Sequence, residues 1–165
     1  MAELTPLDEK LAEVIGLAQA AQDTVAKVAK MEDAEKFESD LSRMKSEATE
    51  TEERAVTLIS GDAFEGKKTA ILDKARETKS EAAEMRDAYL EGEEEALDGF
   101  EFLTMAEAGE LGHWEIVQTM AEVAGEAKVK ELADWAVGVQ SKHFEGVRLA
   151  ALELAKEEAK ELASA

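Results

Sequence analysis

The chain has 165 residues, with 39 acidic and 19 basic side chains and a formal net charge of −20. Such a field repels phosphate backbones and anionic lipid surfaces, so we expect no nucleic-acid partner and no membrane partner. Metal cations and a basic protein remain open as partners. The chain has no cysteine, which excludes disulfides, thiolate metal sites and cysteine nucleophiles.

The composition also indicates the fold class and the location. Alanine-rich apolar content, with a single proline and ten glycines, leaves little turn chemistry for strands and predicts an all-α protein. No apolar run approaches the roughly 18 residues that cross a bilayer. The first residues lack the basic and apolar regions of a signal peptide. We therefore expect a cytoplasmic protein.

The first half of the chain predicts three helices within a single helical domain over 1–165. Thr5 and Pro6 form a typical helix start, and apolar residues at alternating steps of four and three extend this helix over about 6–30. A second apolar stripe predicts a helix over about 32–59. A third, weaker stripe predicts one over about 63–90, which either stops at Gly92 or continues into the next segment.

The second half predicts helices over about 91–124 and 127–162, which turn back on each other at Gly125. Seven of the ten glycines and both histidines lie in this half, so we interpret the first half as scaffold. The hairpin sets Gly109 and Gly112 opposite Gly138, which predicts a close approach of the two backbones. From Asp87 to Glu126 there is no lysine or arginine, which is typical of a solvated acidic face.

Two stripes of this hairpin contain polar residues that suit metal binding. Glu110-Leu-Gly-His113 places a carboxylate and an imidazole three positions apart, on one helix face. The apolar stripe of its helix passes through both of them: Leu103, Ala106, Glu110, His113, Val117 and Met120. The stripe of the last helix passes through His143, with Gln140 one turn earlier. Because a buried unpaired carboxylate is costly, we expect these groups to contact one another or a cation.

Positions symmetric about Gly125 meet in an antiparallel hairpin, so Glu107 and Glu110 should lie level with Gln140 and His143. Carboxylate, carboxamide and imidazole donors together suit Fe, Mn or Zn. The alternative is a buried network of hydrogen bonds among Glu, His and Gln that only fixes the register of the helices. The sequence assigns no enzymatic activity, since it has no phosphate-binding glycine loop and no arranged nucleophile.

These residues resemble the half-site of the ferritin-like di-metal bundles over about residues 94–155. In that superfamily a carboxylate on one helix faces Glu-x-x-His on its antiparallel partner. Glu107 or Glu110 matches the first element, and Gln140-Ser-Lys-His143 matches the second, with Gln in place of Glu. The run from Gly112 to Ile116 is similar to a stress-associated branch of the superfamily, with glycine in place of an acidic residue.

The resemblance implies an all-α, up-and-down bundle with a ferritin-like C-terminal hairpin and a helical N-terminal half. It implies a degenerate metal site, or one shared between two chains, with Glu107, Glu110, His113, Gln140 and His143 as ligands. The helices predicted over 6–30 and 32–59 hold no histidine, so a second half-site would come from a second copy in a homodimer. The alternative function is a non-catalytic structural or stress-associated interaction module.

Overall fold

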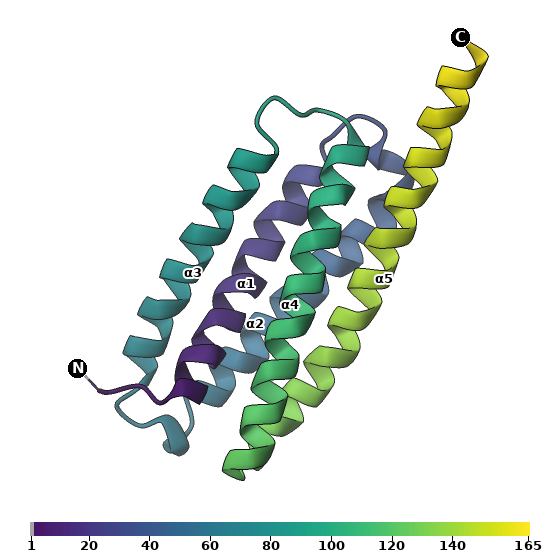
Figure 1. Ribbon diagram of the computed structural model, residues 1–165. Coiled ribbons are helices and arrows are strands. Elements are labelled where there is room, and N and C mark those ends of the chain that lie inside the picture. Colours follow the sequence, from purple (N-terminus) through teal and green to yellow (C-terminus); the bar gives the residue numbers. More distant parts are fainter. Residues whose placement is uncertain (1) are drawn as a thin grey trace.

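The computed structural model describes residues 2–165, which form five long helices and, within that range, no strand (Figure 1). Two short 3₁₀ turns, Ala34–Phe37 and Asp62–Phe64, lie in the first two connections. The prediction of an all-helical protein is confirmed. The helices are α1 Pro6–Val28, α2 Glu38–Ile59, α3 Lys68–Tyr89, α4 Ala96–Ala124 and α5 Ala127–Ser164.

Four of the helices form an up-and-down bundle. α1 packs against α2 and α4, and α5 packs against α4 and α2, so the four helices close into a ring in which each neighbour is antiparallel (Figure 1). α3 packs mainly against α1, on the outside of this ring. It carries the chain from the lower end of α2 back to the upper end, where α4 begins. α3 is therefore a full-length helical crossover between two helical hairpins.

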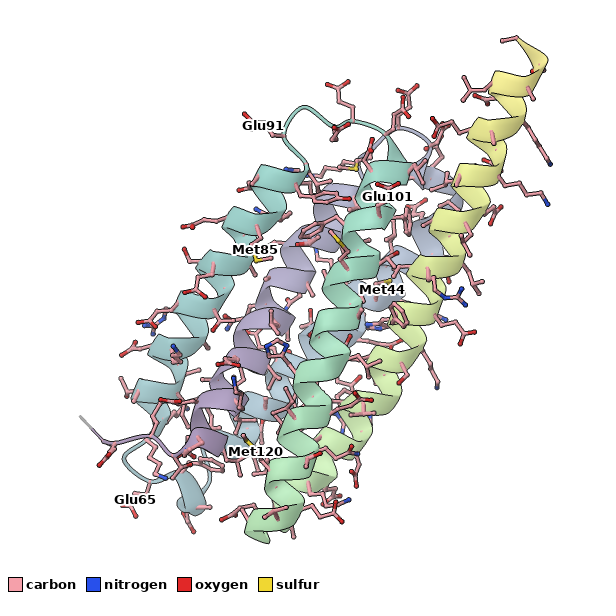
Figure 2. The ribbon with its side chains drawn as sticks, in the orientation of Figure 1. Met44, Glu65, Met85, Glu91, Glu101 and Met120 are labelled. Atoms are coloured by element: carbon pink, nitrogen blue, oxygen red, sulfur yellow. The ribbon has the colours of Figure 1, made fainter. Side chains whose placement is uncertain are left out.

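The predicted helix bounds hold for α1 and α5 to within two residues. The predicted start at residue 32 is wrong, because the Glu32 backbone bonds instead to the loop before α4: its N–H donates to the Glu94 carbonyl and its carbonyl accepts from Ala96. α3 and α4 are separate helices, with Gly92 at a φ of 76° between them. Glu91 in this loop points away from the bundle (Figure 2), as a solvated acidic run should.

The apolar core is divided into two clusters. The lower cluster contains Leu11, Ile15, Ile59, Ile71 and Trp114, together with the first buried residues of α5. The upper cluster is built around Phe37, Leu41, Phe100, Leu103 and Val147. Between them, at mid-height, buried polar side chains of α4 and α5 interrupt the core. We call Glu47, Glu107, Glu110, Gln140 and His143 the polar layer.

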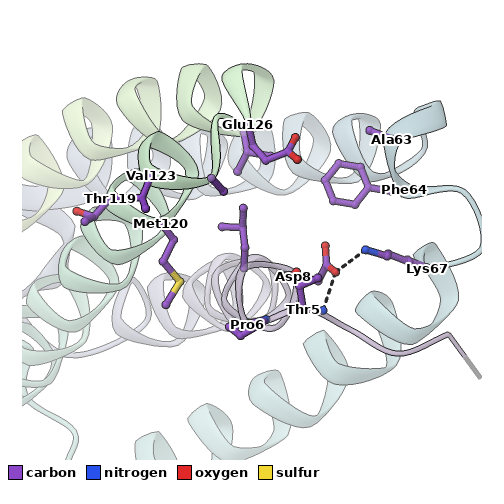
Figure 3. Close-up of a pocket in the computed structure, with 13 residues that line it drawn as sticks. Thr5, Pro6, Asp8, Ala63, Phe64, Lys67, Thr119, Met120, Val123 and Glu126 are labelled. Carbon is purple, nitrogen blue, oxygen red and sulfur yellow. Dashed lines mark hydrogen bonds and ion pairs between the residues drawn. The ribbon is translucent and has the colours of Figure 1, made fainter.

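The start of α1 is tied to the connection between α2 and α3. The Thr5 side chain and the Asp8 carboxylate cap each other's backbone N–H groups, as the Thr5-Pro6 sequence predicts for a helix start. Asp8 also accepts a hydrogen bond of 2.8 Å from Lys67 (Figure 3). Although burial opposes its ionisation, these donors hold the pKa of Asp8 below its ordinary value. This contact fixes the loop that begins the crossover.

The predicted close approach of Gly109 and Gly112 to Gly138 is wrong. A Cβ atom at any of these three positions would meet nothing within 4 Å. The glycines that admit a neighbouring helix are Gly16, which lies against Ala75 and Thr78 of α3, and Gly99, which lies against Val28 and Met31. The hairpin of α4 and α5 instead packs through ordinary side chains.

The inner seam of that hairpin is covered by α1 and α2 of the same chain. A helical hairpin taken alone would expose this seam to a second copy, but here α1 and α2 cover it. No helix of the described part of the chain is long and apolar enough to cross a membrane.

Candidate functional site

The polar layer contains four of the five residues that the sequence marks as metal ligands. Glu107 and Glu110 on α4 are 2% and 3% exposed, and Gln140 and His143 on α5 are 0% and 3% exposed. Their burial on the facing seams of the hairpin is confirmed. Core positions normally hold apolar groups, so four buried polar side chains at one level are an expensive feature that calls for a compensating interaction.

The predicted symmetry about Gly125 is confirmed by one contact. His143 Nδ1 lies 3.6 Å from Glu107 Oε2, across the hairpin. This separation is longer than an ordinary hydrogen bond, so the two groups interact mainly as charges. Gly125 makes the turn with a φ of 73°, which fixes the pairing of the two helices.

Glu47 of α2 is the member of the layer that sequence reasoning missed. Its Oε2 lies 3.1 Å from His143 Nε2, and its side chain is 27% exposed, at the edge of the bundle. Glu47 lies one turn after Met44 and beside Ala48, both on the buried stripe of α2. That placement was a weak signal in a helix with several glutamates. The first half of the chain is therefore part of the site and not only scaffold.

His113 is not part of the layer, and the prediction that it lies on the buried seam is wrong. Its side chain is 40% exposed. Its Nδ1 lies 2.8 Å from the Gly109 carbonyl, to which it donates, and its Nε2 lies 3.7 Å from a carboxylate oxygen of Glu13 on α1. The reason is helix register. The fully buried Trp114 takes the core position at this level of α4, so the adjacent His113 lies beside the buried seam and not on it.

Several polar atoms of the layer lack a hydrogen-bond partner among residues 2–165. They are Glu107 Oε2, Glu110 Oε1 and both polar atoms of the Gln140 carboxamide. The indole N–H of Trp114, outside the layer, also lacks a hydrogen-bond partner. Such atoms are rare in native interiors, because each one loses its hydration without replacement. Their concentration at one level marks the layer as a place where a polar ligand would be stabilised.

The layer also shifts two ionisation equilibria. Burial, and then the neighbouring Glu107 charge, raise the pKa of Glu110 well above its ordinary value. Burial opposes protonation of His143, but Glu107 and then Glu47 outweigh it and raise the pKa of the imidazole. Without a bound cation, the layer therefore favours a protonated Glu110 and a charged His143.

The types of donor atom in the polar layer suit a metal ion, but the present arrangement of the side chains suits one less well. Two carboxylates, a carboxamide oxygen and an imidazole are common ligands of Fe, Mn and Zn. The unpartnered oxygens of Glu107, Glu110 and Gln140 could serve as donors. However, both nitrogens of His143 face carboxylates, and within the part of the chain that the structure describes no three His, Asp or Glu side chains converge as a coordination group.

No family model, no curated protein and no solved structure matches this chain. Fold and site alone therefore define the class of protein. It is an all-helical protein in which a four-helix bundle with one helical crossover encloses a buried layer of carboxylates, carboxamide and imidazole.

Proposed function

We propose that this chain is a ferritin-like helical-bundle protein that binds Fe, Mn or Zn in its polar layer. The topology supports the proposal, because four-helix bundles with one long crossover connection are the architecture of ferritin-like folds. The position of the layer supports it as well, since metal sites in such bundles are built from inward side chains of facing helices.

The observation that carries the proposal is the pair of buried carboxylates on α4. Glu107 and Glu110 each have an unpartnered oxygen, and no lysine or arginine among residues 2–165 is buried beside them. Glu107, Glu110 and the Gln140 carboxamide oxygen would hold the ion, with His143 as the nitrogen ligand and Glu47 positioning its imidazole. A divalent cation would supply the positive charge that relieves the repulsion between the two carboxylates.

The test is elemental analysis of protein purified without a metal-affinity tag, combined with melting curves before and after chelation. We expect bound Fe, Mn or Zn and a melting temperature that falls on chelation, because a ligand stabilises only the form that binds it. His143→Ala should abolish tight binding, while the control Glu115→Gln, at an exposed acid on α4, should retain it. A wild-type melting temperature that changes neither with chelator nor with any of the three metals decides against the proposal.

A second candidate function rests on a different observation, the use of both His143 nitrogens by carboxylates. In this candidate the layer is a protein-only network that fixes helix register in a structural or stress-associated interaction module. Either single change, Glu107→Ala or His143→Ala, then strands its partner and costs about 1–3 kcal/mol. Replacing both with apolar residues of similar size should recover much of that loss, and chelator should change nothing.

We also propose a cytoplasmic location, since the strongly acidic composition suits a soluble protein. Fractionation of cells that express the protein from its own promoter tests this, and recovery in a membrane or secreted fraction contradicts it.

A further inference from the structure

An apolar groove of about 310 Å³ runs between α3 and α4 and is floored by α1. Its size is at the lower end of ordinary small-molecule sites, which span about 300–1,000 Å³. Leu17 and Ala21 contribute from α1, Ala82 and Met85 from α3, and Met105 from α4. Met85 is 69% exposed and lies on the side of α3 that faces α1 (Figure 2).

Both ends of the groove are bounded by contacts that hold neighbouring helices together. At the upper end the rings of Tyr89 and Phe102 lie 5.4 Å apart and join the end of α3 to α4. At the lower end His113 of α4 lies beside Glu13 of α1. The thioethers of Met85 and Met105 between these ends are adaptable, which suits a wall that closes over an apolar guest.

The groove differs from an ordinary surface depression because two buried carboxylates lie in its wall. Glu107 and Glu110 both line it and are at least 97% buried. Each has an oxygen without a hydrogen-bond partner, and that of Glu107 also lies 3.6 Å from His143 Nδ1. Among the described residues, the groove has no lysine or arginine in its lining. The nearby Lys79 of α3 is paired with Asp23, at 3.3 Å, and so is not directed at these carboxylates.

The geometry points to a binding site for an amphipathic organic cation, an amine with an alkyl or aryl body, in the groove of α1, α3 and α4. The body lies along the alanine, leucine and methionine walls, and the ammonium group reaches Glu110 and Glu107. The apolar walls supply affinity through burial, and the carboxylates supply selectivity for positive charge. An anion of the same shape forms no favourable contact with these carboxyl groups, and a neutral alcohol forms no ion pair with them.

The inference does not rest on the proposed metal function, and its test is run with chelator present throughout. Calorimetric titration compares n-decylamine with 1-decanol and decanoate, which share one chain and differ only in charge. We expect decylamine to bind about tenfold or more tightly than decanol and decanoate not to bind. Equal binding of amine and alcohol, or binding of neither, overturns the inference.

Two pairs of variants locate the site. Gly109 lines the groove and has open space at its Cβ, so Gly109→Leu should fill the groove and abolish decylamine binding without disturbing the helix. Its matched control, Gly138→Leu, changes a glycine of α5 with the same open space outside the groove and should bind as the wild type does.

Glu110→Gln keeps the shape but removes the carboxylate that would pair with the ammonium group, and should lower decylamine affinity about tenfold while decanol affinity stays the same. Glu115→Gln should change neither. Decylamine binding that survives Gly109→Leu would place the amine elsewhere and overturn the inference. Gly109→Leu also separates the two proposals, because loss of amine binding with retention of metal in elemental analysis shows that the groove and the metal function are independent.

Discussion

His143 Nε2 lies 3.1 Å from Glu47 Oε2, a contact between α5 and α2 that joins residues 96 positions apart. The other ring nitrogen lies 3.6 Å from Glu107. One imidazole therefore connects the N-terminal hairpin to both helices of the C-terminal hairpin. Because the contact needs all three helices in one register, it is a sensitive reporter of how the two hairpins dock.

The first prediction concerns the charge of His143. Its raised pKa means that the folded protein holds the proton more tightly than the unfolded chain does. The resulting stabilisation is complete below the unfolded pKa of about 6.5 and is lost as pH rises through the folded value. Glu47→Gln should lower the His143 pKa, measured by NMR titration in the presence of chelator. Glu53→Gln, an exposed acid of the same helix, should leave it unchanged.

The second prediction concerns Glu110. A carboxyl group whose pKa is raised by folding contributes most stability below about 4.5, its ordinary value, and loses that contribution as pH rises. Glu110→Gln removes the ionisable group and so the loss of stability with rising pH. It should therefore stabilise the chelated protein at about pH 8 by roughly 1–3 kcal/mol relative to its effect at about pH 5. Urea denaturation at the two pH values measures this difference. The same pH dependence in Glu110→Gln and in the exposed control Glu115→Gln contradicts it.

The third prediction concerns the start of α1. Asp8→Ala removes the capping carboxylate and the partner of Lys67, and should cost about 1–2 kcal/mol in thermal or urea unfolding. Because the folded pKa of Asp8 is lowered, its contribution is present above about pH 4 and is lost as pH falls further. Lys67→Ala should also destabilise, whereas Lys68→Ala, at the exposed neighbouring position, should not. An equal effect of the two lysine variants would contradict the pairing of Lys67 with Asp8 as the source of this stability.

The fourth prediction is a homodimer. Leu149 and Leu152 on α5 are 52% and 55% exposed, and neither is covered within the chain. We expect sedimentation velocity at on the order of tens of micromolar to show a dimer, and the double change Leu149→Glu and Leu152→Glu to yield monomer. Leu162→Glu, at an exposed leucine near the end of α5, is the control. If the wild-type protein remains monomeric, a metal site shared between two chains is excluded, and only a site within one chain is left.

The helical class, the single proline at a helix start and the hairpin at Gly125 followed from the sequence alone, because they depend on local propensity and on the period of the apolar residues. The meeting of Glu107 with His143 followed as well. Once a tight turn and two regular helices are known, symmetry about the turn fixes which residues face each other.

Tertiary structure decided what periodicity could not. Adjacent positions such as His113 and Trp114 differ by only 100° around a helix, so the choice of which one is buried depends on how α1 packs against α4. Glu47 joined the layer because α2 packs beside α5, and no local pattern separates it from the other glutamates of α2. The groove exists only because the crossover helix α3 lies on α1 next to α4. The packing of helices that are distant in the sequence cannot be read from any local pattern of residues. This packing therefore placed the third carboxylate and formed the groove.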